Sequence, residues 1–140
     1  MSANIVKIEI LDNKARIPTK AHDGDACYDI YSIDEYTLHP GSFHAFRTGL
    51  KMQVEPGYYI EIRPRSGLAI NHGITVLNSP GTIDSNYGEE VKIILINHGK
   101  EPYTFLAGNR IAQMTIHKSV NIEFKESKIE GRAGFGSSGV

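Results

Sequence analysis

The chain has a single cysteine, no long apolar run and almost no net charge, and each of these excludes a class of protein. Cys27 cannot form a disulfide within the chain, and a burial role suits it better than a nucleophilic one. The first ten residues, MSANIVKIEI, lack the charged start and apolar core of a secretion signal. No stretch approaches the roughly 18 apolar residues that span a bilayer. We therefore expect a cytoplasmic or otherwise intracellular protein without a membrane contact.

Charge and motif content exclude several partners and chemistries. The 15 Lys and Arg residues nearly cancel the 16 Asp and Glu residues, so a nucleic-acid partner is not indicated, although a small anionic ligand is compatible. The chain contains no G-x-x-x-x-G-K-[ST] phosphate-binding loop, and its six histidines show no H-x-x-x-H spacing for zinc. A length of 140 residues suits one compact domain.

Short apolar runs rich in Val, Ile, Tyr and Thr alternate with turn signals, and this pattern is typical of an all-β sandwich or barrel of about ten strands. The turns are marked by HPGS (39–42), EPGY (55–58), SPG (79–81) and NHGK (97–100). VKIEI (6–10) alternates as a half-buried strand does. VKIILIN (91–97) is apolar on both faces, which predicts that a second sheet or another subunit covers it.

One short helix is predicted over SGLAINHG (66–73), with Ser66 capping its first turn and Gly73 in the left-handed position after its end. RPRS (63–66) leads into this helix, so Arg63, Arg65 and Ser66 stand beside free backbone N–H groups that can bind a phosphate. The alternative is a capped helix with exposed arginines on a turn, and the residues alone leave both open.

Three carboxylates are candidates for catalysis or metal binding. Asp84 follows Ile83 at the end of an apolar run, so it can be a general base for water, or an ordinary turn aspartate that bonds its own backbone. Asp25 and Asp29, in DGDACYDIYS (23–32), can hold water around Mg²⁺, or they can be loop acids before a strand.

From Lys125 onward the apolar density falls, and EGRAGFGSSGV (130–140) has the Gly and Ser content of a flexible tail. Such a tail can wrap a ligand, with the ring of Phe135 stacking on a base and the hydroxyls of Ser137 and Ser138 reaching phosphates. The alternative is a disordered end without a role, which composition alone favours.

Five strings, in order, resemble the motifs of the trimeric deoxyuridine triphosphate nucleotidohydrolases, the dUTPases: DACYDIYS, RPRSGLA, LNSPGTIDSNYGEE, GNRIAQM and GRAGFGSSG. The resemblance implies a jelly-roll-like β-barrel domain over residues 1–124 and a flexible tail over 125–140 that closes over an active site. It implies a homotrimer with active sites at its subunit interfaces. It also implies Mg²⁺-dependent cleavage of dUTP to dUMP and pyrophosphate.

The same resemblance implies roles for the residues at matching positions. Asp84 would activate the water that attacks the α-phosphate, and Asp29 would hold waters around Mg²⁺. Asn78 would bind uracil beside backbone groups of its hairpin, and Tyr87 beneath the deoxyribose would exclude a 2′-hydroxyl. The remaining contacts to the nucleotide would come from Gly81 and Ile83 in the hairpin, from Arg65, Ser66, Gly67 and Gln113 at the phosphates, and from Arg132, Phe135, Gly136, Ser137 and Ser138 in the tail.

The chain departs from the family pattern in several places. YGEE (87–90) stands where Tyr-Arg-Gly-Glu is usual, so an arginine is missing and Glu89, at the place of a glycine, is expected to strain the turn. Cys27 replaces a usual glycine, which predicts crowding of the loop that carries Asp29. Asn109 replaces a usual aspartate, and Arg132 stands closer to the tail aromatic than is usual.

Two alternatives stand beside dUTP hydrolysis. A binding or regulatory protein that has kept the fold and lost turnover would account for the altered YGEE and tail arginine. The dCTP deaminases share the fold implied by the resemblance, but they would need a catalytic glutamate where Ile94 stands.

Overall fold

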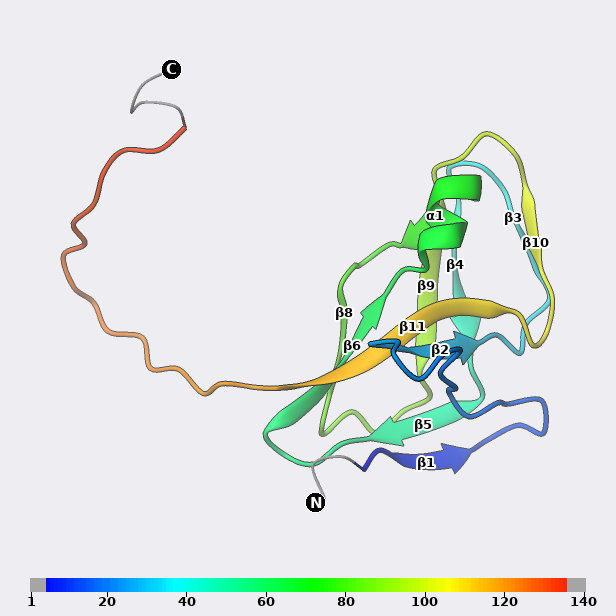
Figure 1. The fold of residues 1–140 in the computed structure, drawn as a ribbon, viewed down its shortest axis with the longest axis horizontal. Coiled ribbons are helices and arrows are strands. Elements are labelled where there is room, and N and C mark those ends of the chain that lie inside the picture. Colours follow the sequence, from blue (N-terminus) through cyan, green and yellow to red (C-terminus); the bar gives the residue numbers. More distant parts are fainter. Residues whose placement is uncertain (1–4, 136–140) are drawn as a thin grey trace.

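The computed structural model describes residues 5–135 and arranges them as eleven short strands and one helix (Figure 1). A mostly β chain with about ten strands and one short helix is therefore confirmed. The described residues contain no helix with the length and apolar character needed to cross a bilayer. In chain order the elements are β1 (Lys7–Ile10), β2 (Tyr28–Tyr31), β3 (Tyr36–Leu38), β4 (Phe43–Arg47), β5 (Leu50–Gln53), β6 (Tyr58–Arg63), α1 (Ser66–His72), β7 (Ile74–Val76), β8 (Gly81–Asp84), β9 (Lys92–Asn97), β10 (Tyr103–Phe105) and β11 (Arg110–Lys118).

Antiparallel pairing joins the strands into four sheets. A four-stranded sheet has the order β2-β11-β6-β8, and a three-stranded sheet has the order β4-β9-β7. Two further pairs are β1 with β5 and β3 with β10. In Figure 1 the β1–β5 pair lies at the bottom of the molecule and α1 at the top. Within residues 5–135 these sheets do not close into a barrel.

Most strands bury the side chains of one face in a common apolar core. In β6, Ile60 and Ile62 are buried, whereas Tyr59, Glu61 and Arg63 on the other face are half-buried. This follows from the period of two residues along a strand. Other strands supply the largest fully buried side chains, among them Phe46, Phe105, Ile30, Leu38, Leu50 and Met52. The polar residues of β6 therefore share its outer face.

In β9 burial alternates from residue to residue along the strand, whereas in β1 it does not. In β9, Ile93 and Leu95 are buried while Ile94 and Ile96 are half-buried, so one chain covers the outer face of this strand only in part. In β1 the exposure is greater than alternation predicts, since Ile10 is 57% exposed. β1 pairs with β5 alone, and an edge strand is covered less than a central one.

The helix α1 has the bounds that the sequence predicts, but its start differs. Gly73 follows the last turn in the left-handed conformation, with φ 66°, as expected. Arg65 has an extended backbone, occupies the N-cap position and makes no side-chain cap hydrogen bond, so the prediction that Ser66 caps the helix is wrong. The extended geometry of β6 continues through Arg65, which makes Ser66 the first helical residue and not the cap.

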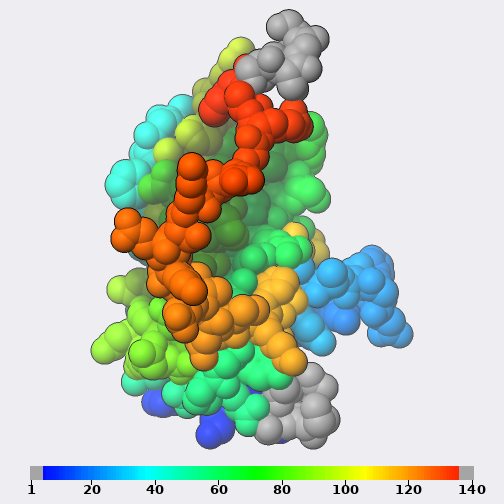
Figure 2. Space-filling model, turned by 90° about the vertical axis from the view of Figure 1, so that its left-hand side faces the viewer, coloured from blue at the N-terminus to red at the C-terminus, as the bar shows by residue number. Residues whose placement is uncertain are grey.

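After β11 the chain continues to residue 135 without a strand or helix. Figure 1 shows this segment, orange to red, curving away from the sheets, and in Figure 2 it stands in front of the body. Val120, Ile122 and Phe124 are exposed by 79%, 67% and 89%. These three residues alternate as in a strand, so an apolar row lies open on the segment 119–125.

Candidate functional site

Three polar side chains form one row across the four-stranded sheet. Gln113 of β11 is paired with Asp29 of β2 on one side and with Arg63 of β6 on the other. Residues opposite each other on neighbouring antiparallel strands point to the same face, with Cβ atoms about 5 Å apart. The pairing therefore brings a carboxylate, an amide and a guanidinium side by side from three distant parts of the sequence.

This row borders a polar cavity of about 380 Å³. The chain passes from β6 through Pro64 into α1, which brings the start of the helix to the same cavity. Asp25 and Cys27, in the segment before β2, line it from another side. Five residues that the sequence assigns to phosphate or metal binding line the cavity together: Asp29, Arg65, Ser66, Gly67 and Gln113.

Asp29 lies between two arginine side chains of this cavity. Its Oδ1 lies 3.9 Å from Nε of Arg65 and its Oδ2 lies 3.7 Å from an Nη of Arg110, and the side chain is 15% exposed. One carboxylate therefore faces two guanidinium groups, at distances longer than direct hydrogen bonds. Gln113 is oriented by its Nε2, which donates to the carbonyl oxygen of Pro64 at 3.1 Å.

Asp25 forms two hydrogen bonds in the turn before β2. Its Oδ2 accepts a hydrogen bond from the backbone N–H of His22 at 2.9 Å, and the backbone N–H of Asp25 donates to the carbonyl oxygen of His22 at 3.0 Å. These two bonds close the turn. Across residues 5–135, no cluster of three or more His, Cys, Asp or Glu side chains could hold a metal ion directly.

A second group of predicted site residues lies on β8 and the turns that flank it. Gly81 is buried opposite Ile62 of β6, and a Cβ atom on it would lie 3.0 Å from the Cβ of Ile62. The strands therefore approach closely at this position. Asn78 is exposed in the turn before β8, and Ile83 is half-buried within the strand.

Asp84 ends β8 with an exposed side chain. Its carbonyl oxygen accepts from the N–H of Tyr87 at 3.1 Å and so closes the following turn. Within the described part of the chain its carboxylate accepts no hydrogen bond, so the alternative of an aspartate that bonds its own backbone is not supported. Tyr87 is 40% exposed, and its hydroxyl donates to the carbonyl oxygen of Glu90 at 2.9 Å.

Asp84 and the polar cavity lie at opposite ends of β6. Asp84 is paired with Tyr59 near the start of that strand, whereas Arg65 follows its end. Six residues of extended chain, at about 3.3 Å each, separate the two positions by roughly 20 Å. A single chain therefore does not bring the carboxylate of Asp84 to its own cavity.

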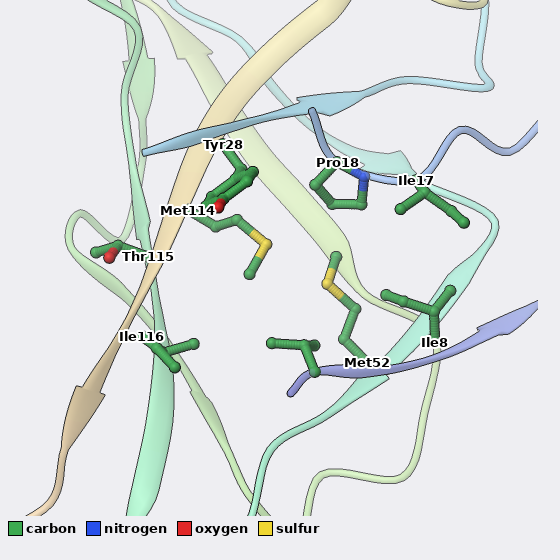
Figure 3. A pocket seen from close by; sticks show the side chains of 9 residues that line it. Ile8, Ile17, Pro18, Tyr28, Met52, Met114, Thr115 and Ile116 are labelled. Carbon is green, nitrogen blue, oxygen red and sulfur yellow. The ribbon is translucent and has the colours of Figure 1, made fainter. Parts of the chain in front are cut away.

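A larger cavity, of about 520 Å³, lies beside β1 and is apolar. Figure 3 shows the side chains of Met52 and Met114 converging on it. Among the residues that line it, Tyr28 and Thr115 alone carry a polar side-chain group. A triphosphate needs several donors, so the polar cavity beside Gln113 is the better candidate site for an anion.

Comparison with known proteins decides the family. The family model described as dUTPase matches residues 13–139. The chain belongs to the dUTPase family. The deoxyuridine 5′-triphosphate nucleotidohydrolase of Clostridium acetobutylicum is 45% identical over 140 residues, which cover 96% of this chain and 97% of that protein. The protein of the same name from Trichodesmium erythraeum is 45% identical, and the match covers 96% and 99% of the two chains.

Solved dUTPase structures have the same fold as this chain. The Staphylococcus bacteriophage 80alpha dUTPase with dUPNHPP has a TM-score of 0.85 at 25% identity, and the match covers 98% of this chain and 99% of that chain. The dUTPase of phage phi11 of S. aureus, whose structure reveals the coordination of a structural Mg(II) ion, has a TM-score of 0.82 at 22% identity, with 91% and 99% covered. The family predicted from five short strings is confirmed.

The altered YGEE segment of this dUTPase is not strained. Among the described non-glycine residues, Phe135 alone has a positive φ, so the expectation that Glu89 strains its turn is wrong. The turn reverses without a left-handed residue and therefore does not need glycine there. Glu90 anchors the segment, because its carboxylate accepts from Nε of Arg47 at 3.1 Å and from the N–H of Gly49 at 2.9 Å.

The other two departures in the body of this dUTPase are Asn109, whose side chain takes a defined hydrogen bond, and Cys27. Oδ1 of Asn109 accepts from the N–H of Leu106 at 2.7 Å, a hydrogen bond that an aspartate would accept equally well. Cys27 is a half-buried free thiol at the cavity, and Asp29 keeps its pairing with Gln113 beside it. The predicted crowding of this loop by Cys27 stays a prediction.

The tail of this dUTPase carries the remaining predicted contacts. Arg132 and Phe135 are exposed. Gly136, Ser137 and Ser138 lie outside the described residues. The contacts of all five residues with a nucleotide stay predictions.

Arg110 escaped the sequence reasoning, although it stands in a quoted motif, and the place of Arg63 beside Gln113 could not be predicted. Arg110 pairs with Asp29, and Arg63 completes the row with Gln113. The register of β11 against its two neighbours would have identified them, because it sets which residues share a face. Local periodicity does not contain that register.

Proposed function

We propose that this dUTPase hydrolyses dUTP to dUMP and pyrophosphate, which limits uracil incorporation into DNA and supplies dUMP. One observation carries the proposal: five residues from three separate motifs, matching the family's phosphate and metal positions, line one polar cavity. The names of relatives at 45% identity and the nucleotide dUPNHPP in the bacteriophage 80alpha structure support it.

The cavity supplies donors of several kinds for a triphosphate. The guanidinium of Arg65 offers a fork of N–H groups, which matches the geometry of phosphate oxygens. Ser66 offers its hydroxyl and Gly67 a backbone N–H in the first turn of α1, where the helix itself provides no acceptor. Gln113 has a second amide N–H beside the one donated to Pro64.

The donor set fits a Mg²⁺ ion that the nucleotide brings. The described residues provide no direct cage for a metal, so the triphosphate oxygens would supply the direct ligands. Asp29 would hold part of the water shell, because a carboxylate is the kind of oxygen acceptor that Mg²⁺ waters bond. When bound, the ion would neutralise charge on the phosphates.

Asp84 is the proposed general base. Its exposed carboxylate is free of hydrogen bonds within the described part of the chain and can take a proton from a water molecule. As that proton moves to the carboxylate, the water oxygen bonds the α-phosphorus and pyrophosphate leaves. A positioned base contributes about 10² to 10⁴ in rate.

The segment around β8 is the proposed site for the base and the sugar. Asn78 and the backbone groups of Gly81 and Ile83 would pair with the donor and acceptor edge of uracil. Cytosine presents the wrong pattern, and each buried polar group left unpaired costs about 1–3 kcal/mol. The ring of Tyr87 would lie against the deoxyribose and leave no room for a 2′-hydroxyl.

Each active site would form at the interface between subunits of a homotrimer. The separation of Asp84 from the cavity of its own chain supports a shared site, as does the partly covered outer face of β9. The jelly-roll-like body would comprise residues 1–124, and the tail 125–140 of one subunit would close over a site between two others. We infer a cytoplasmic or otherwise intracellular location from the nucleotide substrate.

Pyrophosphate release in the presence of Mg²⁺ tests the proposal. We expect rapid release from dUTP and little from UTP, dCTP or dTTP. Asp84→Asn should lower the dUTP rate by at least about 10². Glu35→Gln, which neutralises an exposed carboxylate elsewhere, should leave the rate unchanged. Tight binding of dUTP without hydrolysis would instead support the binding-protein alternative.

A further inference from the structure

Arg63 lies among the proposed phosphate residues without a role in the reaction described above. It stands opposite Gln113 on the outer face of β6, two residues before Arg65, and it lines the same cavity. Its side chain is 43% exposed, so the guanidinium is accessible. Its position in the row with Gln113 and Asp29 is therefore that of a site residue.

Glu61 holds the guanidinium of Arg63 by one edge. Nε of Arg63 lies 2.5 Å from Oε1 of Glu61, which is two residues earlier on the same face of β6. This contact uses the Nε–H group, and the Cys27 thiol at the cavity is a further neighbour of the guanidinium, which keeps other Nη N–H groups for an anion. The hydrogen bond and the charge of Glu61 raise the pKa of Arg63, so the guanidinium stays protonated.

The charges around the cavity make Arg63 a further cation for an anionic ligand. Arg65 and Arg110 both face Asp29, a carboxylate that itself lines the cavity. The counter-ion of Arg63 differs, because Glu61 is not among the cavity's lining residues. An anion in the cavity would meet Arg63 without meeting its carboxylate partner.

We propose that Arg63 is a further phosphate-binding residue of this dUTPase and that Glu61 is the positioning residue that orients it. The inference rests on the proposed function, because it takes the cavity as the triphosphate site. A guanidinium held at Nε presents its Nη groups to phosphate oxygens with little loss of side-chain freedom on binding. Arg63 would thus strengthen ground-state binding of the phosphates.

Arg47 provides a matched control for the test. It too is bonded through Nε to a glutamate, Glu90, at 3.1 Å, and its side chain is 44% exposed. It does not line the polar cavity. Replacing either arginine by glutamine removes one exposed, ion-paired guanidinium, so a difference between the two variants reports on the cavity.

The experiment compares the full-length parent, Arg63→Gln and Arg47→Gln. Calorimetric titration with inorganic pyrophosphate in Mg²⁺ buffer gives a Kd, and steady-state kinetics with dUTP give kcat and KM. We expect Arg63→Gln to weaken pyrophosphate binding and raise KM by roughly tenfold each, with kcat within about twofold of the parent. Inhibition of Arg63→Gln by deoxyuridine, which has no phosphate, should be unchanged, and Arg47→Gln should leave the pyrophosphate Kd unchanged.

A double-mutant cycle tests the role of Glu61. Glu61→Gln should weaken pyrophosphate binding about threefold in the parent, because the guanidinium loses its charged anchor. The same substitution should have no effect in the Arg63→Gln background, since Glu61 acts through Arg63. Equal effects in both backgrounds would overturn the positioning role.

Several results would overturn the assignment of Arg63. These are a pyrophosphate Kd for Arg63→Gln within about twofold of the parent, an equal loss of deoxyuridine binding, or no pyrophosphate binding by the parent. If Arg63→Gln does not fold, Arg63→Lys replaces it, and a loss of about three- to fivefold is expected, because the charge is kept but the fork of donors is lost. A parent that binds pyrophosphate but does not cleave dUTP contradicts the proposed function alone.

Discussion

At the scale of single residues, Glu61 lies beside two basic side chains, Arg63 and His117. Its Oε1 lies 2.5 Å from Nε of Arg63 and 3.5 Å from Nε2 of His117, and that imidazole nitrogen is buried without a hydrogen bond in the described part of the chain. The hydrogen bond from Arg63 lowers the pKa of Glu61, and the charges of Arg63 and His117 act in the same direction. The folded chain therefore favours the ionised form of Glu61 more than the unfolded chain does.

This pKa shift predicts an effect of acid on stability. A carboxyl with a lower pKa in the folded than in the unfolded chain stabilises the fold above its unfolded value of 4.5, and the stabilisation is lost as the pH falls through the folded pKa. Melting followed by circular dichroism at about pH 6 and about pH 3 should show a smaller loss of Tm for Glu61→Gln than for the parent. Glu35→Gln should lose as much as the parent. Equal losses for all three proteins would show that the pair contributes nothing.

Tyr87 predicts the sugar selectivity. Its ring would exclude a 2′-hydroxyl, while its own hydroxyl donates a hydrogen bond to the carbonyl oxygen of Glu90. Tyr87→Ala should therefore lower the ratio of kcat/KM for dUTP over UTP by at least about tenfold. Tyr87→Phe keeps the ring and should keep the ratio. A loss of selectivity in Tyr87→Phe alone would assign the effect to the hydroxyl.

At the scale of elements, the end of α1 depends on glycine. Gly73 has φ 66°, its carbonyl oxygen accepts from the N–H of His98 at 2.8 Å, and a Cβ atom on it would lie 2.7 Å from the backbone nitrogen of Gly99. This contact holds the helix that carries Ser66 and Gly67 against the turn after β9. Any side chain at position 73 meets both a strained backbone and a clash.

Gly73→Ala should therefore destabilise the protein by at least about 1–3 kcal/mol. Urea unfolding followed by tyrosine fluorescence measures this loss. Gly24→Ala is the control, because its Cβ atom would have no neighbour within 4 Å, and it should unfold as the parent does. Equal stability of Gly73→Ala and the parent would mean that the backbone at the helix end rearranges freely.

The strands and the helix could be predicted from the sequence, whereas the pairing between strands could not. Turn signals and alternation predicted the strands and the helix α1, because both depend on neighbours in the chain. Sequence patterns did not predict two other features. Ile10 is exposed because β1 is an edge strand that pairs with β5 alone, and Arg65 is the N-cap because its backbone is still extended after β6. Motif strings predicted Asp29 and Gln113, but the place of Arg63 beside them depends on strand register, which no local pattern contains.

For the whole molecule, one chain leaves apolar surface that a trimer would cover. The row Val120, Ile122 and Phe124 is exposed, and the outer face of β9 is only half-buried. We expect sedimentation equilibrium at micromolar concentration to give about three times the 15.5 kDa mass of one chain. A monomer under these conditions would contradict the shared active site.

The central claim is that dUTP is cleaved by Asp84 of one chain at the cavity of another. Its most direct test is pyrophosphate release by trimers assembled from two inactive chains, Asp84→Asn and Arg65→Gln, each carrying a different purification tag. If the base and the cavity come from different chains, every trimer that contains both variants has about one third of its sites with both residues intact. We predict that purified mixed trimers regain about that share of the parent rate. Mixed trimers no more active than either variant alone would contradict the account, because they would place Asp84 and Arg65 in the same chain's site.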